Sequence, residues 1–211
     1  MSVNGNLLTL LPAFGLNGFL AGSLGVTGMT GAEAAKRLLQ SQGIYDVTVR
    51  PVRGQLTDHY DPRTKTVNLS QSVYGATSVA AIGVAAHECG HAMQDNEGYA
   101  PLRFRSALVP AANFGSKLSW PLILLGLVFG GLGSPLVEIG ILMFSLAVLF
   151  QLVTLPVEYN ASARAVRLLD SQGILAGEEV SGTRKVLNAA ALTYVAAAAT
   201  SILQLLRLII L

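Results

Sequence analysis

Three residues near the middle of the chain, His87, Glu88 and His91, have the types and spacing of a metal-dependent hydrolase. They lie in a run of small and apolar residues that can form a helix. His87 and His91 would then fall one turn apart on one face, and each could offer a ring nitrogen to the same metal ion. Zinc favours such a site, completed by a third protein ligand and by a water whose pKa the metal lowers to about 7. With Glu88 beside the histidines as the base, the motif predicts metal-assisted hydrolysis.

The composition is that of a membrane protein. Charged residues make up 12% of the 211 residues, against roughly 25% in soluble domains, and hydrophobic residues make up 52%. A net charge of +2, with no basic run interleaved with aromatics, excludes a nucleic-acid-binding protein. The fold class that we expect is a mainly α membrane protein. Transmembrane helices would accompany a small α/β metalloprotease-like cytoplasmic portion with a short β-hairpin or sheet.

Polar and apolar segments alternate along the chain, and the apolar ones are about as long as the 20 residues that cross a bilayer. We expect an N-terminal membrane-inserted or interfacial segment (1–26), a cytoplasmic α/β portion carrying the His-Glu-x-x-His helix (27–105), a transmembrane hairpin (106–155), a cytoplasmic helix with the third zinc ligand (156–185) and a C-terminal transmembrane helix (186–211).

Local patterns predict the elements around the motif. Thr30 and Glu33 have the spacing of a capping box that opens a helix. Residues 47–52 alternate like a strand, and residues 55–70 indicate two short strands joined by a tight turn. An exposed edge strand at 65–70 could hold an extended peptide by main-chain pairing.

Two nearly identical runs, 37–44 and 167–174, differ at a single position. Their likeness does not extend into the flanking residues, and no longer repeat supports a duplication. Both runs are instead typical of helix ends, with Gly43 and Gly173 in the left-handed conformation that terminates a helix.

Charge placement predicts the orientation in the membrane. A hairpin returns the chain to the side that it left, so segments 27–105 and 156–185 face one compartment. They carry every Lys and Arg of the chain except Lys117 and Arg207. Because short cytoplasmic loops carry an excess of Lys and Arg, we expect this side, and the active site with it, to be cytoplasmic.

Three further residues are candidates for the site. Glu158 is the best candidate for the third ligand, because it lies on a predicted helix at the mouth of the hairpin. A carboxylate at a membrane boundary without an obvious ion-pair partner is expected to bind a cation. His59 could close the site as a fourth ligand or steady the oxyanion of a tetrahedral intermediate, and Tyr60 could do the latter; a role in surface or hairpin packing is as well supported. Cys89, the single cysteine, is turned away from the face of the two histidines and is expected to pack between helices.

Four runs resemble the YugP-type zinc-dependent membrane metallopeptidases of bacteria. These are Gly54-Gln-Leu-Thr-Asp-His-Tyr-Asp-Pro-Arg-Thr-Lys, Ala81-Ile-Gly-Val-Ala-Ala-His-Glu-Cys-Gly-His-Ala-Met-Gln-Asp, Gly98-Tyr-Ala-Pro-Leu-Arg-Phe-Arg-Ser-Ala-Leu-Val-Pro and Leu155-Pro-Val-Glu-Tyr-Asn-Ala-Ser-Ala-Arg-Ala. The resemblance implies a gluzincin-like zinc site in a multi-pass protein of the bacterial cytoplasmic membrane, with His87, His91 and Glu158 as ligands and Glu88 as base and proton shuttle. Many gluzincins carry an Asp four residues after the third ligand to orient a metal histidine. Here that position is Ser162, so Ser162 or Asn160 is expected to take the role.

The function that we expect is zinc-dependent hydrolysis of peptide bonds in a peptide or protein substrate, soluble or membrane-embedded, with the lipid bilayer as the other partner. One alternative is a non-catalytic membrane scaffold or adaptor with a structural zinc, which would need four protein ligands and would have no use for Glu88. A second is a zinc hydrolase of a non-peptide substrate. A transporter is disfavoured, because the apolar segments offer only Glu138 and Arg207 as ionisable residues, both near segment ends. The sequence does not indicate an oligomeric state.

Overall fold

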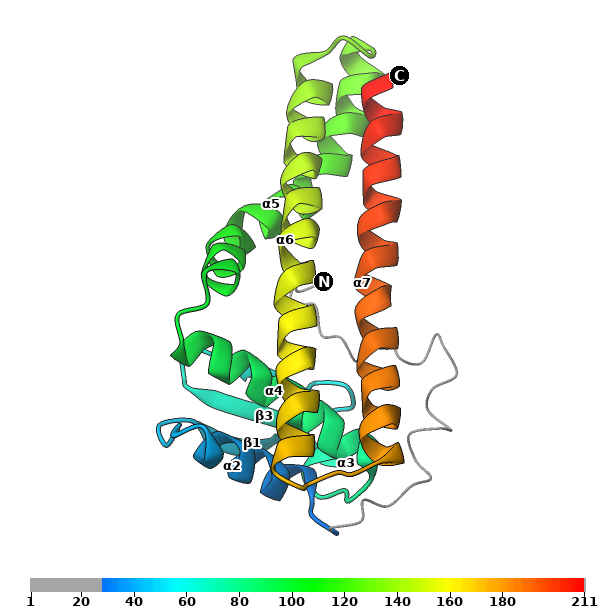
Figure 1. The fold of residues 1–211 in the computed structure, drawn as a ribbon. Helices are drawn as coiled ribbons and strands as arrows, with labels where there is room; N and C mark the ends of the chain where they lie inside the picture. The colour runs from blue at the N-terminus through cyan, green and yellow to red at the C-terminus, as the bar shows by residue number, and fades with distance from the viewer. Residues whose placement is uncertain (1–27, 211) are drawn as a thin grey trace. The chain divides into compact units, whose positions relative to one another are not determined.

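The computed structural model describes residues 28–210, so the segment expected to insert in the membrane within residues 1–26 lies outside the described residues. The elements, in chain order, are α2 (Gly31–Ser41), β1 (Thr48–Val52), β2 (His59–Asp61), β3 (Thr66–Ser70), α3 (Gln71–Tyr74), α4 (Val79–Asn96), α5 (Ala100–Gly130), α6 (Pro135–Ser171) and α7 (Glu178–Ile210) (Figure 1). Contacts divide them into two units. The α/β unit comprises residues 28–99 and 157–193, and the apolar unit comprises residues 100–156 and 194–210.

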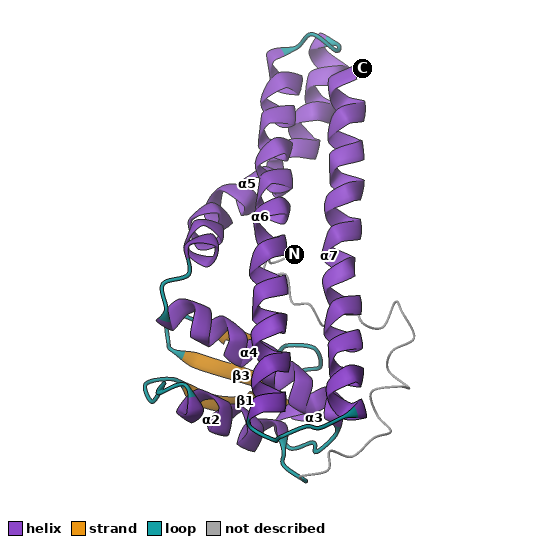
Figure 2. Cartoon of the chain, viewed as in Figure 1, coloured by secondary structure: helices purple, strands orange, loops and turns teal. Residues whose placement is uncertain are grey.

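The three strands form one sheet in the order β1-β3-β2. Figure 2 shows β1 and β3 in orange. β1 runs parallel to β3 and β2 runs antiparallel to it, so that Val49 and Tyr60 both lie opposite Val67. The expectation of an exposed edge strand at 65–70 is therefore wrong. Val67 and Leu69 are fully buried, and β1 pairs with the side of β3 that the hairpin leaves open. The edge strands are β1 and β2.

The predicted helix ends are confirmed. At the start of α2 the Thr30 N–H donates to the Glu33 carboxylate, and the Glu33 N–H donates to the Thr30 hydroxyl, which completes the capping box. Gly43 and Gly173 both adopt positive φ angles, +70° and +60°, two residues after the last residues of α2 and α6. The two similar runs also meet, because the Arg37 guanidinium donates to the backbone carbonyl of Gln172, 3.0 Å away.

Helix α4 lies at the centre of the α/β unit. The Ser78 hydroxyl caps it by accepting a hydrogen bond from the Ala81 N–H. Every residue from Ala81 to Gln94 is buried, since α2 and the strands β2 and β3 contact the helix and α6 packs against it at Gly90. The many Ala and Gly residues of α4 allow these neighbours to approach closely.

Three helices, α5, α6 and α7, are long and apolar enough to cross a membrane, as judged by length and composition. Within the apolar unit α5 and α6 form a hairpin around a turn at residues 131–134. Glycines set their spacing: a Cβ on Gly126 would lie 2.7 Å from Val137, and a Cβ on Gly140 would lie 2.6 Å from Ile123. Residues 106–155, where we expect a transmembrane hairpin, thus lie within two closely packed helices and the turn between them.

The boundary expected at Pro156 coincides with the division between the two units, but it does not end a helix. Helix α6 continues through Pro156 to Ser171, so the second hairpin helix and the helix that carries Glu158 are one element. Proline removes one backbone hydrogen bond, but the helix is held beyond it by burial. Side chains four residues apart, at Val157, Ala161, Ala165 and Leu169, are fully buried in the α/β unit.

Candidate active site

The structure brings together His87, His91 and Glu158, whose ligand atoms lie within 4.8 Å of one another. The Glu158 Oε2 atom is 3.2 Å from the His87 Nε2 atom and 3.6 Å from the His91 Nε2 atom. Two ligands bonded tetrahedrally to zinc at about 2.0–2.1 Å lie about 3.4 Å apart. The two distances from Glu158 therefore match those between ligands of a zinc site.

Gly90 allows this meeting of α4 and α6. A Cβ at this position would lie 2.6 Å from the backbone oxygen of Ala161 and 3.0 Å from its Cα atom. Because these are backbone atoms of α6, they cannot move aside as a flexible side chain could. Only glycine lets the helix that carries Glu158 come this close to the two histidines.

A hydrogen-bond chain orients His91. Its Nδ1 atom lies 3.0 Å from the Gln94 Oε1 atom. The Gln94 amide group donates to the Val157 carbonyl and to the Asn160 Oδ1 atom, which also accepts from the Arg164 guanidinium. Since the Gln94 oxygen is left to accept, His91 Nδ1 is the donor, and the Nε2 lone pair is free to bind a metal.

A single residue, Ser162, orients the ring of His87. Its Nδ1 atom lies 3.1 Å from the Ser162 hydroxyl, so its Nε2 atom also faces Glu158. Ser162, one of the two residues expected to orient a metal histidine, contacts His87 directly. Asn160, the other, acts on His91 through Gln94.

The donor set fits zinc. Two imidazole nitrogens and one carboxylate oxygen are the ligands of many catalytic zinc sites, which keep a fourth position for water or substrate. Both Nδ1 atoms are occupied by hydrogen bonds, so both Nε2 atoms point to the shared centre. Within residues 28–210 this is the one group of three or more His, Cys, Asp or Glu side chains arranged to hold a metal ion.

Glu88 is buried beside this group, with 4% of its surface exposed. Its carboxylate accepts a hydrogen bond from the backbone N–H of Tyr60, 3.0 Å away, which joins β2 to α4. Burial raises the pKa of Glu88 to about 7, and the neighbouring carboxylates of Glu158 and Asp58 act in the same direction. A divalent cation at the triad would oppose this shift by favouring the carboxylate.

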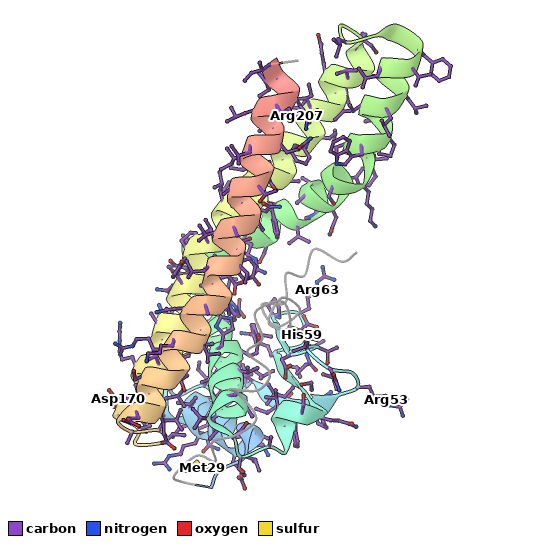
Figure 3. The ribbon with its side chains drawn as sticks, turned by 90° about the vertical axis from the view of Figure 1, so that its right-hand side faces the viewer. Met29, Arg53, His59, Arg63, Asp170 and Arg207 are labelled. Carbon is purple, nitrogen blue, oxygen red and sulfur yellow. The ribbon has the colours of Figure 1, made fainter. Side chains whose placement is uncertain are left out.

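His59 and Tyr60 lie on β2, where Figure 3 labels His59. The ring of His59 is exposed, and its nitrogens lie 2.7 Å from the Thr57 carbonyl and 3.3 Å from the Asn68 amide. The metal group found among the described residues does not include it. The Tyr60 hydroxyl donates to the Asp95 carboxylate. That either side chain steadies an oxyanion stays a prediction.

Cys89 packs away from the metal group, as its position on the helix predicts. Its Sγ atom lies 3.6 Å from the backbone oxygen of Ala35 in α2, and the residue is fully buried. Burial raises the pKa of the Cys89 thiol. The residue is therefore an inert contact between α2 and α4, and its oxidation is disfavoured.

Sequence reasoning missed Gln94 and Gly90. The i, i+3 spacing of His91 and Gln94 could have indicated their contact, because residues three apart on a helix are neighbours. The need for Gly90 depends on the backbone of α6, which is about 70 residues away in the sequence, so no local pattern reveals it.

Fold and site together define a membrane protein with the metal group of a zinc metallopeptidase. A family model described as "Putative neutral zinc metallopeptidase" matches residues 23–211, and the chain belongs to this family. A similar protein is the "Putative membrane protease YugP" of Bacillus subtilis (strain 168), which is 51% identical over 183 residues, 87% of this chain and 80% of that protein. No solved structure matches the chain.

Proposed function

We propose that this protein is an integral membrane zinc metalloendopeptidase that hydrolyses peptide bonds. The observation that carries the proposal is Glu88, a buried carboxylate held by the Tyr60 N–H directly beside a group of three metal ligands. A structural zinc site fills all four positions with protein ligands and needs no base. Neither His59 nor Cys89 joins the metal group found within residues 28–210. The relative's name, a membrane protease, supports the same class of reaction.

Each residue of the site has its own role in the proposed hydrolysis. His87, His91 and Glu158 would hold the zinc ion, which when bound polarises the scissile carbonyl and lowers the pKa of the attacking water. Glu88 takes the proton of that water and passes it to the leaving amine. The Tyr60 N–H fixes the direction of the Glu88 carboxylate, and Ser162 and Gln94 keep the histidine nitrogens aimed at the metal. His59 or Tyr60 is the proposed donor to the oxyanion.

The test is hydrolysis of an unstructured protein, casein, by the purified protein and its Glu88→Gln variant. We expect the wild type to cleave casein, and the variant to keep its zinc but to lose turnover by at least about 100-fold, the contribution of a general base. Equal rates for the two proteins would contradict the proposal. Glu88-dependent hydrolysis of a lipid amide without any cleavage of casein would favour the non-peptide alternative.

We also propose that the protein resides in the bacterial cytoplasmic membrane with the active site on the cytoplasmic side. The basic residues of segments 27–105 and 156–185 support this orientation. The only native cysteine is buried, so single cysteines can be added and labelled with an impermeant maleimide. In spheroplasts we expect labelling of Gly133→Cys at the hairpin turn, and labelling of Arg53→Cys only after lysis. The reverse pattern would invert the topology.

A further inference from the structure

The α/β unit contains a cavity between the first half of α4 and the start of α7. Its volume is about 290 Å³, and its walls include Ala80, Gly83 and Val84 from α4 and Thr183 and Val186 from α7. Most of the lining surface is apolar. The cavity is near the lower end of the roughly 300–1,000 Å³ of ligand sites, a size that suits one side chain better than a whole lipid.

The α4 residues that line this cavity are neighbours of the proposed active-site residues along the helix. Val84 precedes His87 by three residues and Glu88 by four, and residues at these spacings on a helix are neighbours on one face. Ala80 lies one further turn along the same face. The α4 side of the cavity therefore lies one helical turn before the proposed metal ligand and base.

Thr183 gives the cavity one polar contact. It is 2% exposed, and its hydroxyl has no hydrogen-bond partner among the described residues. A Cβ on Gly83 would lie 2.8 Å from the Thr183 methyl group, so α4 and α7 are in close contact at this point. A buried donor without a partner is unfavourable, and an occupant with a carbonyl oxygen would satisfy it.

Charge limits the kind of occupant. Glu178 and Glu179, at the start of α7, also line the cavity. Their carboxylates repel a phosphate headgroup or an acidic side chain. A neutral apolar group is the occupant that fits both the apolar walls and these two carboxylates.

We propose that this cavity binds a large apolar side chain of the substrate polypeptide next to the cleaved bond, and that the Thr183 hydroxyl donates to a main-chain carbonyl of the bound segment. The inference rests on the proposed peptidase function and adds the substrate class: segments with Leu, Ile, Met or Phe beside the scissile bond, and not Asp or Glu.

The test uses zinc-loaded protein and fluorescence-quenched peptides that differ at one position, with Ala, Leu, Phe or Asp. Ala80→Leu narrows the cavity, and Ala163→Leu makes the same change at an exposed position of α6 as a control. We expect Ala80→Leu to lower kcat/KM for the Phe peptide by about tenfold or more, relative to the Ala peptide. The Ala163→Leu variant should keep the wild-type ratio. A uniform loss on all peptides, or none, would overturn the inference.

A binding measurement separates this inference from the proposed function. Zinc-loaded Glu88→Gln protein should bind the Leu and Phe peptides about tenfold more tightly than the Ala peptide by fluorescence anisotropy. Adding Thr183→Val should weaken this binding about threefold to tenfold, because one hydrogen bond is lost. Equal affinity for all peptides would overturn the cavity assignment even if the wild type is active. A clear preference in this variant, with an inactive wild type, would support the cavity and refute the peptidase.

Discussion

The Nδ1 atom of His91 lies 3.0 Å from the Oε1 atom of Gln94, one helical turn further along α4. The Gln94 amide nitrogen is 2.8 Å from the Val157 carbonyl and 3.0 Å from the Asn160 side chain, so Gln94 ties α4 to the segment of α6 that carries Glu158. One side chain thus fixes the tautomer of His91 and links it to the segment of α6 that carries Glu158.

Replacing Gln94 by methionine should weaken zinc binding. Methionine fills a similar space but neither accepts from His91 nor donates to α6. We expect about 10- to 100-fold lower zinc affinity, the usual effect of losing a partner of a metal ligand. Competition with a chromophoric chelator measures this. Gln71→Met, at an exposed position of α3, is the matched control, and an unchanged affinity in Gln94→Met would mean that Gln94 does not position His91.

Gly90→Ala should separate the two helices of the metal site. The added Cβ would overlap the Ala161 backbone, and relief requires α6 to shift. We expect loss of zinc and destabilisation by about 1–3 kcal/mol, the range for overpacking a core. The same change at Gly182 in α7, where nothing lies within 4 Å, should leave zinc content unchanged. Chemical denaturation and zinc quantification test both, and normal zinc in Gly90→Ala would refute this role.

The metal-free protein should be sensitive to pH through Glu88. Burial raises the pKa of Glu88 to about 7 in the folded protein, above its ordinary value of 4.5. The stability that the protonated group contributes is complete below about pH 4.5 and is lost as the pH rises through 7. Glu88→Gln should therefore stabilise the metal-free protein at pH 8, on the order of 3 kcal/mol, and hardly at pH 5. Denaturation curves with chelator at both pH values test this; an equal difference at both would contradict it.

Local features of the fold could be predicted from sequence, and long-range ones could not. The capping box at Thr30 and the positive φ at Gly43 depend on neighbouring residues alone, and both were expected. β3 is the central strand because β1 pairs with it in parallel. Such a pairing joins strands that are not neighbours in the sequence, so no local pattern predicts it. Helix α6 runs past Pro156 because its following residues are buried in the α/β unit, which a boundary drawn from the change in polarity along the chain cannot take into account.

The same distinction holds for the site. The spacing of His87, Glu88 and His91 predicts their roles, and the position of Glu158 after an apolar run indicates a third ligand. The contacts that complete the site come from tertiary packing: Ser162 on His87, the Tyr60 N–H on Glu88, and Gly90 against α6. Tyr60 was predicted for its side chain, but it is the backbone N–H of Tyr60 that contacts Glu88.

The central claim is that His87, His91 and Glu158 together bind one zinc ion, and zinc quantification on purified protein tests it most directly. The wild type should hold about one zinc per chain, three protein ligands being the usual set of a catalytic site. His59→Ala should match it, because the metal group found within residues 28–210 does not include His59. Glu158→Ala should lose most of its zinc after dialysis against a weak chelator. Wild-type zinc content in Glu158→Ala, or loss of zinc in His59→Ala, would contradict the assignment.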